Sequence, residues 1–119
     1  MERKEALFAI FAVGLFVAGV TALAYRTATP GGALDQVAIR HYAFFPGSLT
    51  VQVGATVRWV NMDFVGHTVS FGTHEDPTGV ESPLLGHMGS FAYTFTEPGT
   101  YTYHCDPHPY MTGSVVVAS

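Results

Sequence analysis

The chain has 119 residues, a formal net charge of −4 at pH 7 and a hydrophobic content of 48%. This length favours one domain. From residue 26 onward the sequence has seven acidic residues, three arginines and no lysine. Such a composition argues against nucleic-acid binding, because neutralising phosphates requires cations. The negative charge would attract a basic partner protein, or it serves only to keep the domain in solution.

An apolar, uncharged stretch spans residues 6–24, behind a basic pair near the N-terminus. Its apolar residues leave no polar face, so we expect an N-terminal hydrophobic helix rather than a core helix of a globular domain. Such a helix would rise roughly 28 Å, close to the thickness of a bilayer core, which favours a membrane anchor. The Ala-Leu-Ala at residues 22–24 also fits a signal peptide cleaved near Ala24. Residues 1–25 are therefore predicted to be an anchor or a signal segment. Either one makes the remainder extracytoplasmic, in the periplasm or on the outer face of the cell membrane.

Short strands separated by turns follow a flexible linker of Thr, Gly and Pro composition at residues 26–36. The segments that alternate, or that are rich in β-branched and aromatic residues, are 37–39, 49–51, 56–60, 67–71, 91–95, 100–105 and 114–117. Short strands with turn signals between them predict an all-β sandwich over residues 37–119. Residues 72–89 contain six Gly and Pro and are expected to form one long loop.

The segment from Cys105 to Met111 carries a thiol, an imidazole and a thioether at intervals of three residues. Pro107 and Pro109 stiffen this segment, so Cys105, His108 and Met111 can face one point with little entropy left to lose. Cys105 is the only cysteine of the chain. A lone thiol outside the cytoplasm is a liability unless a metal or another group occupies it.

His67 offers a fourth ligand, because it begins a predicted strand on the core-facing side and strand ends meet at one end of a sandwich. Two His, one Cys and a weak Met form the blue-copper ligand set. Structural zinc would instead take cysteines with histidines and no methionine. His104 neighbours Cys105 and points to the opposite face of the strand, so we expect it to be structural. The histidines without a spacing that relates them to this set are His41, His74 and His87.

Three stretches of the chain resemble the cupredoxins, or blue copper proteins: residues 53–61, 66–69 and 95–111. The resemblance extends over roughly residues 37–117 and is strongest to the amicyanins. The Cys-x-x-His-x-x-Met spacing is the amicyanin form, whereas plastocyanins and pseudoazurins usually have a longer gap between the His and the Met. The resemblance implies a cupredoxin-like Greek-key β-sandwich. It also implies one copper ion per chain that cycles between Cu(I) and Cu(II).

The same resemblance implies roles for individual residues. The strong copper ligands would be His67, Cys105 and His108, with Met111 as the long axial ligand. Gly66 replaces a bulkier residue of the amicyanins, and its carbonyl oxygen could serve as a weak axial ligand. Thr68 stands where the family commonly has an Asn that hydrogen-bonds to the cysteine loop, and its hydroxyl is expected to do similar work.

Electrons would pass through the exposed edge of His108, within an apolar docking patch that Pro107, Pro109 and Tyr110 complete. The function implied is that of a type 1 (blue) copper electron carrier and not of an enzyme. Its copper domain would be monomeric. Its partners would be redox proteins at the outer face of the membrane, namely a donor dehydrogenase or membrane complex and an acceptor cytochrome or oxidase.

Other interpretations stay open at this point. A periplasmic copper-binding or copper-delivery protein is the alternative function, although a stiff ligand loop suits retention of copper better than its release. A multicopper enzyme is not expected, because the sequence lacks the His-x-His pairs and the His-Cys-His run that further copper ions need. In the loop at residues 72–89, the acids Glu75, Asp76 and Glu81 belong to a solvated loop or to a partner patch. The same loop could hold a weak second metal site, with candidates His74, Glu75, Asp76, His87 and Met88. Trp59 is predicted to lie in the core, and Met62 and Met88 are predicted to pack.

Overall fold

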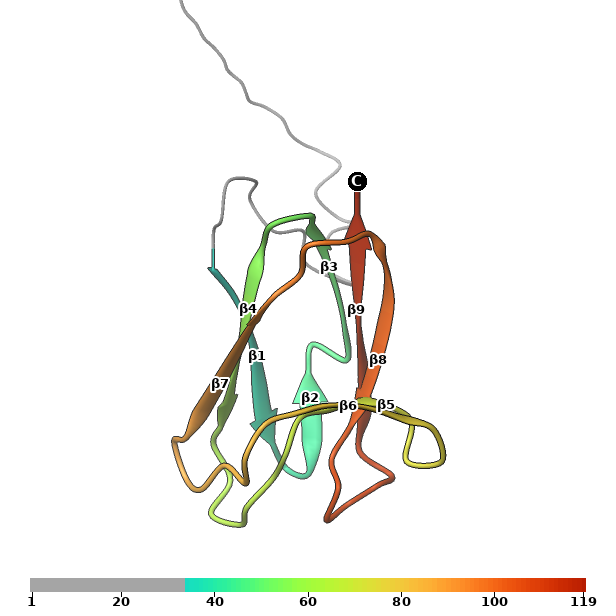
Figure 1. The fold of residues 1–119 in the computed structure, drawn as a ribbon. Coiled ribbons are helices and arrows are strands. Elements are labelled where there is room, and N and C mark those ends of the chain that lie inside the picture. The colour runs from blue at the N-terminus through green and yellow to red at the C-terminus, as the bar shows by residue number, and fades with distance from the viewer. Residues whose placement is uncertain (1–33) are drawn as a thin grey trace, which may run out of the picture.

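Nine β-strands make up the part of the chain that the computed structural model describes, residues 34–119. They are β1 (Leu34–Arg40), β2 (Ala43–Phe45), β3 (Ser48–Gln52), β4 (Thr56–Asn61), β5 (Ser70–Gly72), β6 (Pro77–Glu81), β7 (Ser90–Thr94), β8 (Gly99–His104) and β9 (Thr112–Ala118). One sheet has the order β2-β1-β4-β7 and the other the order β3-β9-β8-β5-β6 (Figure 1). Pairing is antiparallel except between β1 and β4 and between β3 and β9.

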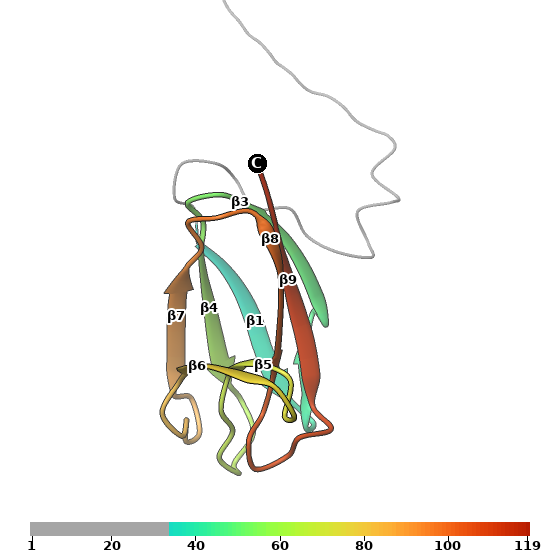
Figure 2. The ribbon, with the colours of Figure 1, turned by 45° about the vertical axis from the view of Figure 1, so that its right-hand side comes forward.

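The two sheets face each other as the layers of a sandwich (Figure 2), which confirms the predicted all-β fold class. Strand β1 begins at Leu34, ahead of the domain boundary predicted at residue 37. The predicted N-terminal helix lies outside the described residues. Among residues 34–119, no helix has the length and apolar character needed to cross a membrane.

The region from residue 67 to 89 departs from its prediction. Strand β5 covers only part of the strand expected at residues 67–71, and His67 pairs with Leu85 in an isolated bridge. The loop expected at residues 72–89 contains strand β6, in which every residue is exposed. The Pro and Gly residues that suggested a loop are tolerated in β6 because it lies at a sheet edge and begins with its proline.

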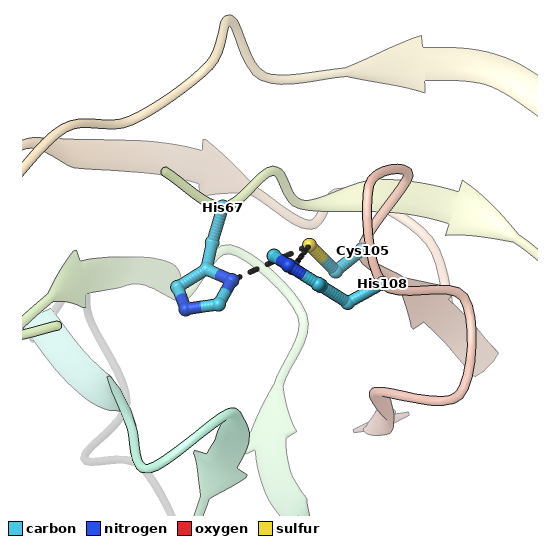
Figure 3. Close-up of side chains that lie close together, drawn as sticks. All are labelled: His67, Cys105 and His108. Carbon is cyan, nitrogen blue, oxygen red and sulfur yellow. Dashed lines mark hydrogen bonds between the residues drawn. The ribbon is translucent and has the colours of Figure 1, made fainter. Parts of the chain in front are cut away.

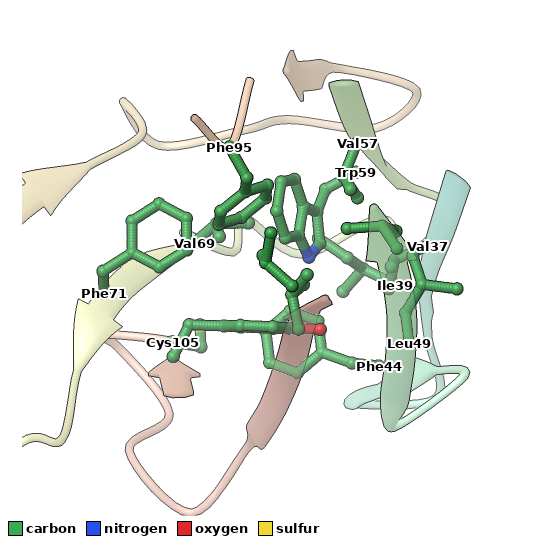
Figure 4. Close-up of a cluster of buried hydrophobic side chains, with 14 of the residues drawn as sticks. Val37, Ile39, Phe44, Leu49, Val57, Trp59, Val69, Phe71, Phe95 and Cys105 are labelled. Atoms are coloured by element: carbon green, nitrogen blue, oxygen red, sulfur yellow. The ribbon is translucent and has the colours of Figure 1, made fainter. Parts of the chain in front are cut away.

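Trp59 lies at the centre of the core and is fully buried, as predicted (Figure 4). It reaches this position because alternate residues of β4 face inward. Its ring meets those of Tyr103 and Phe71 edge-on, at centroid distances of 5.3 and 6.0 Å. Such pairs each add about 0.5–1.5 kcal/mol beyond the burial of their area. The aromatic core therefore fixes the two sheets to each other and gives the loops a rigid base.

The segments that follow β1, β4, β6 and β8 gather at one end of the sandwich, opposite Leu34 and the C-terminus (Figure 1). We call this the loop end, formed by residues 41–42, 62–69, 82–89 and 105–111. Every residue predicted for the copper site and its docking patch belongs to it.

Candidate metal centre

The segment between β8 and β9 is closed by its own backbone. The N–H of His108 donates to the carbonyl of Cys105 at 3.2 Å, and the N–H of Met111 donates to the carbonyl of His108 at 2.9 Å. Each bond joins residues three apart, as in a β-turn. The N–H of Cys105 then donates to the carbonyl of Met111 at 3.1 Å. The three-residue spacing therefore reflects two consecutive turns, which set residues 105, 108 and 111 at successive corners of one compact loop.

His67 is held in place from a different part of the chain. Its N–H donates to the carbonyl of Leu85 at 3.1 Å, and its carbonyl accepts from the N–H of Leu85 at 2.8 Å. The buried side-chain amide of Asn61 donates to the carbonyls of Leu85 (2.8 Å) and Val65 (2.9 Å). One buried amide thus joins the two loops where the regular strand pairing has ended.

Three of the predicted ligands converge at the loop end (Figure 3). The sulfur of Cys105 lies 3.6 Å from Nδ1 of His67 and 3.6 Å from Nδ1 of His108. The ligand atoms of all three residues lie within 4.8 Å of one another. A metal ion bonded to sulfur at about 2.3 Å and to nitrogen at about 2.0 Å would hold the two atoms roughly 3.5–3.8 Å apart. The separations and the donor types therefore fit one metal ion.

Asp63 sets the ring orientation of His67. Its Oδ2 lies 2.9 Å from Nε2 of the ring, so a proton on Nε2 donates to the carboxylate and leaves the lone pair of Nδ1 directed at Cys105. Partial burial alone would raise the pKa of Asp63. Hydrogen bonds from the N–H of Tyr42, the His67 ring and the N–H of His41 outweigh it and hold that pKa below its ordinary value. Asp63 was not predicted, although an acid four residues before a candidate ligand is a signal in the sequence that could have identified it.

Thr68 links the two segments that carry the ligands. Its backbone N–H donates to the sulfur of Cys105 at 3.4 Å. Its hydroxyl accepts a hydrogen bond from the N–H of Asp106 at 2.8 Å. A hydrogen bond to sulfur stabilises the thiolate form, which is the form that binds metals. Thr68 therefore contacts the cysteine loop both at the ligand atom and at its backbone.

His104 and Asp106 anchor the cysteine loop to strand β5. His104 is buried outside the ligand cluster, with Nε2 2.9 Å from Asp106 and Nδ1 2.9 Å from the carbonyl oxygen of Gly72. The hydroxyl of Ser70 donates to Asp106 at 2.8 Å. That hydrogen bond and the one from His104 hold the pKa of Asp106 below its ordinary value, against the opposing effect of burial.

The two residues predicted as axial ligands lie beside this cluster in the sequence. Met111 is buried, with 2% of its surface exposed. Gly66 is half-buried, and a Cβ at this position would approach the side chain of Leu84 to 3.0 Å. The missing side chain of Gly66 therefore makes room for Leu84. The axial roles of Met111 and Gly66 stay predictions.

The residues predicted to form the docking patch lie at the surface around the cluster. Pro107, Pro109 and Tyr110 are exposed, and His108 is half-buried. Two further apolar side chains of the loop end are strongly exposed and were not predicted, Phe64 at 86% and Leu84 at 65%. The apolar surface is therefore wider than the sequence indicated.

Within residues 34–119, the remaining histidines and methionines lie at the surface. His41, His74 and His87 are exposed, and none belongs to a three-ligand cluster of His, Cys, Asp or Glu within residues 34–119. Met62 and Met88 were predicted to pack, but they are 45% and 57% exposed. That prediction was wrong because both residues lie in connections at the loop end, where Met88 also adopts a left-handed backbone conformation with φ 65°.

A family model described as copper-binding proteins of the plastocyanin/azurin family matches residues 33–118. The chain belongs to this family. The recognition of a cupredoxin and the prediction of copper are thereby confirmed, and the three converging ligands fit one copper ion per chain.

Among its relatives, this cupredoxin is 33% identical to amicyanin-alpha of Methylorubrum extorquens over 116 residues, which cover 86% of this chain and 95% of that one. It is 43% identical to amicyanin of Paracoccus denitrificans over 70 residues, a match of 58% of this chain and only 53% of the relative. A solved Cu(I) structure of an amicyanin variant superimposes with a TM-score of 0.65 at 36% identity, over 71% of this chain and 82% of the other. A purple cupredoxin from Nitrosopumilus maritimus gives a TM-score of 0.66 at 30% identity, over 71% of this chain and 99% of the other.

We predict that Thr68→Val destabilises the copper-free protein by about 1–3 kcal/mol, because the N–H of Asp106 loses its acceptor while the side-chain volume is kept. Thr68→Ser is the matched control, since it retains the hydroxyl and should lose much less. Urea unfolding of the two variants measures the difference. Equal losses for Val and Ser would contradict the role given to the hydroxyl.

Proposed function

We propose that this cupredoxin is a type 1 (blue) copper electron-transfer protein that shuttles single electrons between redox partners on the outer face of the membrane. The observation that carries the proposal is the thiol of Cys105 facing Nδ1 of both His67 and His108 at 3.6 Å. In this proposal these three residues are the strong ligands and Met111 is the long axial one. Copper, when bound, supplies a one-electron couple between Cu(I) and Cu(II).

The chain contributes a ligand set that is ordered in advance. Asp63 orients the His67 ring, Thr68 donates to the Cys105 sulfur, and backbone bonds close the loop that carries His108. Ligands held by such contacts move little when the charge at the site changes, and a small rearrangement lowers the barrier to electron transfer. The burial of His67 and Cys105, both at 0% exposure, also favours retention of copper over delivery to another protein.

His108 is the proposed route between the buried sulfur and a partner. It is half-buried and lies among the exposed residues Pro107, Pro109 and Tyr110. A surface hollow of about 730 Å³ lies beside this patch and is lined by Tyr110, Pro109, His74 and Glu75 among others. An apolar patch beside an acidic loop suits a redox protein with an apolar contact surface and a basic rim. A donor dehydrogenase or membrane complex and an acceptor cytochrome or oxidase remain the proposed partners of a monomeric copper domain.

Residues 6–24 are proposed to hold the domain at the membrane or to direct its export. Residues 1–25 would be the anchor or signal segment, 26–36 the linker and 37–119 the copper domain. Strand β1 begins at the end of the sandwich opposite the loop end (Figure 1). A tether attached there leaves the proposed copper centre free to meet a partner.

The full chain loaded with Cu(II) is predicted to show an intense blue thiolate-to-copper absorption band that a mild reductant bleaches reversibly. Cys105→Ser should abolish the band, because a hydroxyl cannot replace the thiolate in that transition. Visible spectra of the wild type and the variant test this. A colourless wild type, or a variant that stays blue, would defeat the proposed function.

Met111→Leu should change the reduction potential and the spectrum of the bound copper, because the weak axial ligand tunes the blue-copper site. Met88→Leu is the matched control, since it makes the same chemical change at a methionine that is 57% exposed. Spectroelectrochemistry compares the two variants. If both leave the potential at its wild-type value, Met111 is a packing residue and not a ligand.

Expression of the full chain in a bacterium with a periplasm distinguishes the two proposals for residues 6–24. An anchor predicts carbonate-resistant membrane association and the intact mass of the uncleaved chain. A signal peptide predicts a periplasmic protein whose mass begins near Ala24. Deletion of residues 6–24 should leave the copper domain in the cytoplasm, and cytoplasmic recovery of the full chain would rule out both proposals.

A further inference from the structure

The turn that joins β1 to β2 has a backbone conformation that is unusual for histidine and tyrosine. Arg40 pairs with Ala43, so His41 and Tyr42 are the two residues of a tight hairpin turn, with φ angles of 52° and 58°. Turns with two left-handed residues favour Asn-Gly, because a Cβ is unfavourable in this region. Residues in such a conformation persist where their surroundings hold them, and they are frequent at functional sites.

The carboxylate of Asp63 holds this turn in its conformation. Oδ1 accepts from the N–H of His41 at 2.8 Å, and Oδ2 accepts from the N–H of Tyr42 at 3.0 Å. The same Oδ2 lies 2.9 Å from Nε2 of His67. One side chain therefore fixes both the turn and a proposed copper ligand.

The turn directs the ring of Tyr42 onto both imidazoles of the candidate centre. Its centroid lies 5.4 Å from that of His67 and 5.0 Å from that of His108, with interplanar angles of 87° and 84°. Tyr42 is 42% exposed, whereas His67 is fully buried and His108 is half-buried. Tyr42 thus covers His67 and part of His108.

We propose that Tyr42 is a positioning residue of the copper centre, an aromatic cover seated by Asp63 that excludes water from both imidazoles and raises the reduction potential. The inference rests on the proposed electron-transfer function. Water stabilises the oxidised state more than the reduced state, because the oxidised state carries the larger charge. Excluding water from the ligands therefore favours the reduced state.

Three variants of the full chain test this proposal: Tyr42→Ala, Tyr42→Phe and the double variant His41→Asn with Tyr42→Gly. The double variant has the favoured turn sequence and no ring, so it separates loss of the cover from loss of stability. We expect it to unfold at a urea concentration no lower than that of the wild type. Spectroelectrochemistry gives the potential, and NMR of the copper-free protein gives the mobility and solvent exchange of the His108 imidazole.

Removing the ring, in Tyr42→Ala and in the double variant, should shift the equilibrium toward the oxidised state by up to about tenfold, which is roughly 59 mV for a one-electron couple. The His108 imidazole should also become more mobile without copper. Tyr42→Phe should keep wild-type values, because it keeps the ring. An unchanged potential in the double variant would overturn the role of Tyr42. A wild type that binds no copper or gives no blue band would instead overturn the proposed function.

Discussion

The proposed centre depends on a close approach of three candidate ligand atoms from two distant segments, with the Cys105 sulfur 3.6 Å from Nδ1 of both His67 and His108. Atoms at this spacing gain little from each other without a metal, so other contacts must hold them. Asp63 fixes one ring, the N–H of Thr68 contacts the sulfur, and backbone bonds close the segment between residues 105 and 111. The entropy of ordering the ligands is thus lost when the chain folds and not when the metal binds.

The two sheets and the loop end hold the candidate ligands in place by different interactions. Trp59 and the aromatic rings around it make a close-packed interior that resists small displacements. Beyond the strands, the loops depend on buried polar groups. The Asn61 amide donates to the carbonyls of Val65 and Leu85, in the two loops that hold His67. His104 and Asp106 link the cysteine loop to β5. Polar groups buried with partners specify a single arrangement, because any other arrangement leaves some of them unpaired.

Whether a feature could be predicted from the sequence depends on how far apart along the chain its interacting residues lie. The loop from Cys105 to Met111 was predictable because its ligands and prolines lie within seven consecutive positions and its turns are local. The inward alternation of the strands revealed Trp59 in the same way. Strand β6 and the bridge between His67 and Leu85 were missed, since an exposed edge strand has no alternation and one bridge leaves no pattern. The contact of Asp63 with His67 spans four positions and left a signal in the sequence. The contacts by which Asp63 holds the turn of Tyr42 span 21 or more positions, and a single sequence does not reveal them.

These long-range contacts also explain why the reduction potential could not be derived from the ligand set. The carboxylate of Asp63, with its lowered pKa, is a negative charge one hydrogen bond away from His67. A negative charge at that position stabilises the oxidised state and lowers the potential. The same carboxylate seats the ring of Tyr42, and in our proposal this ring excludes water and raises the potential. One residue therefore acts on the couple in opposite directions, through its charge and through the turn that it holds. In our proposal the contribution of Asp63 to the potential is the balance of these two effects, and it depends on distances to His41, Tyr42 and His67 that only the folded chain defines.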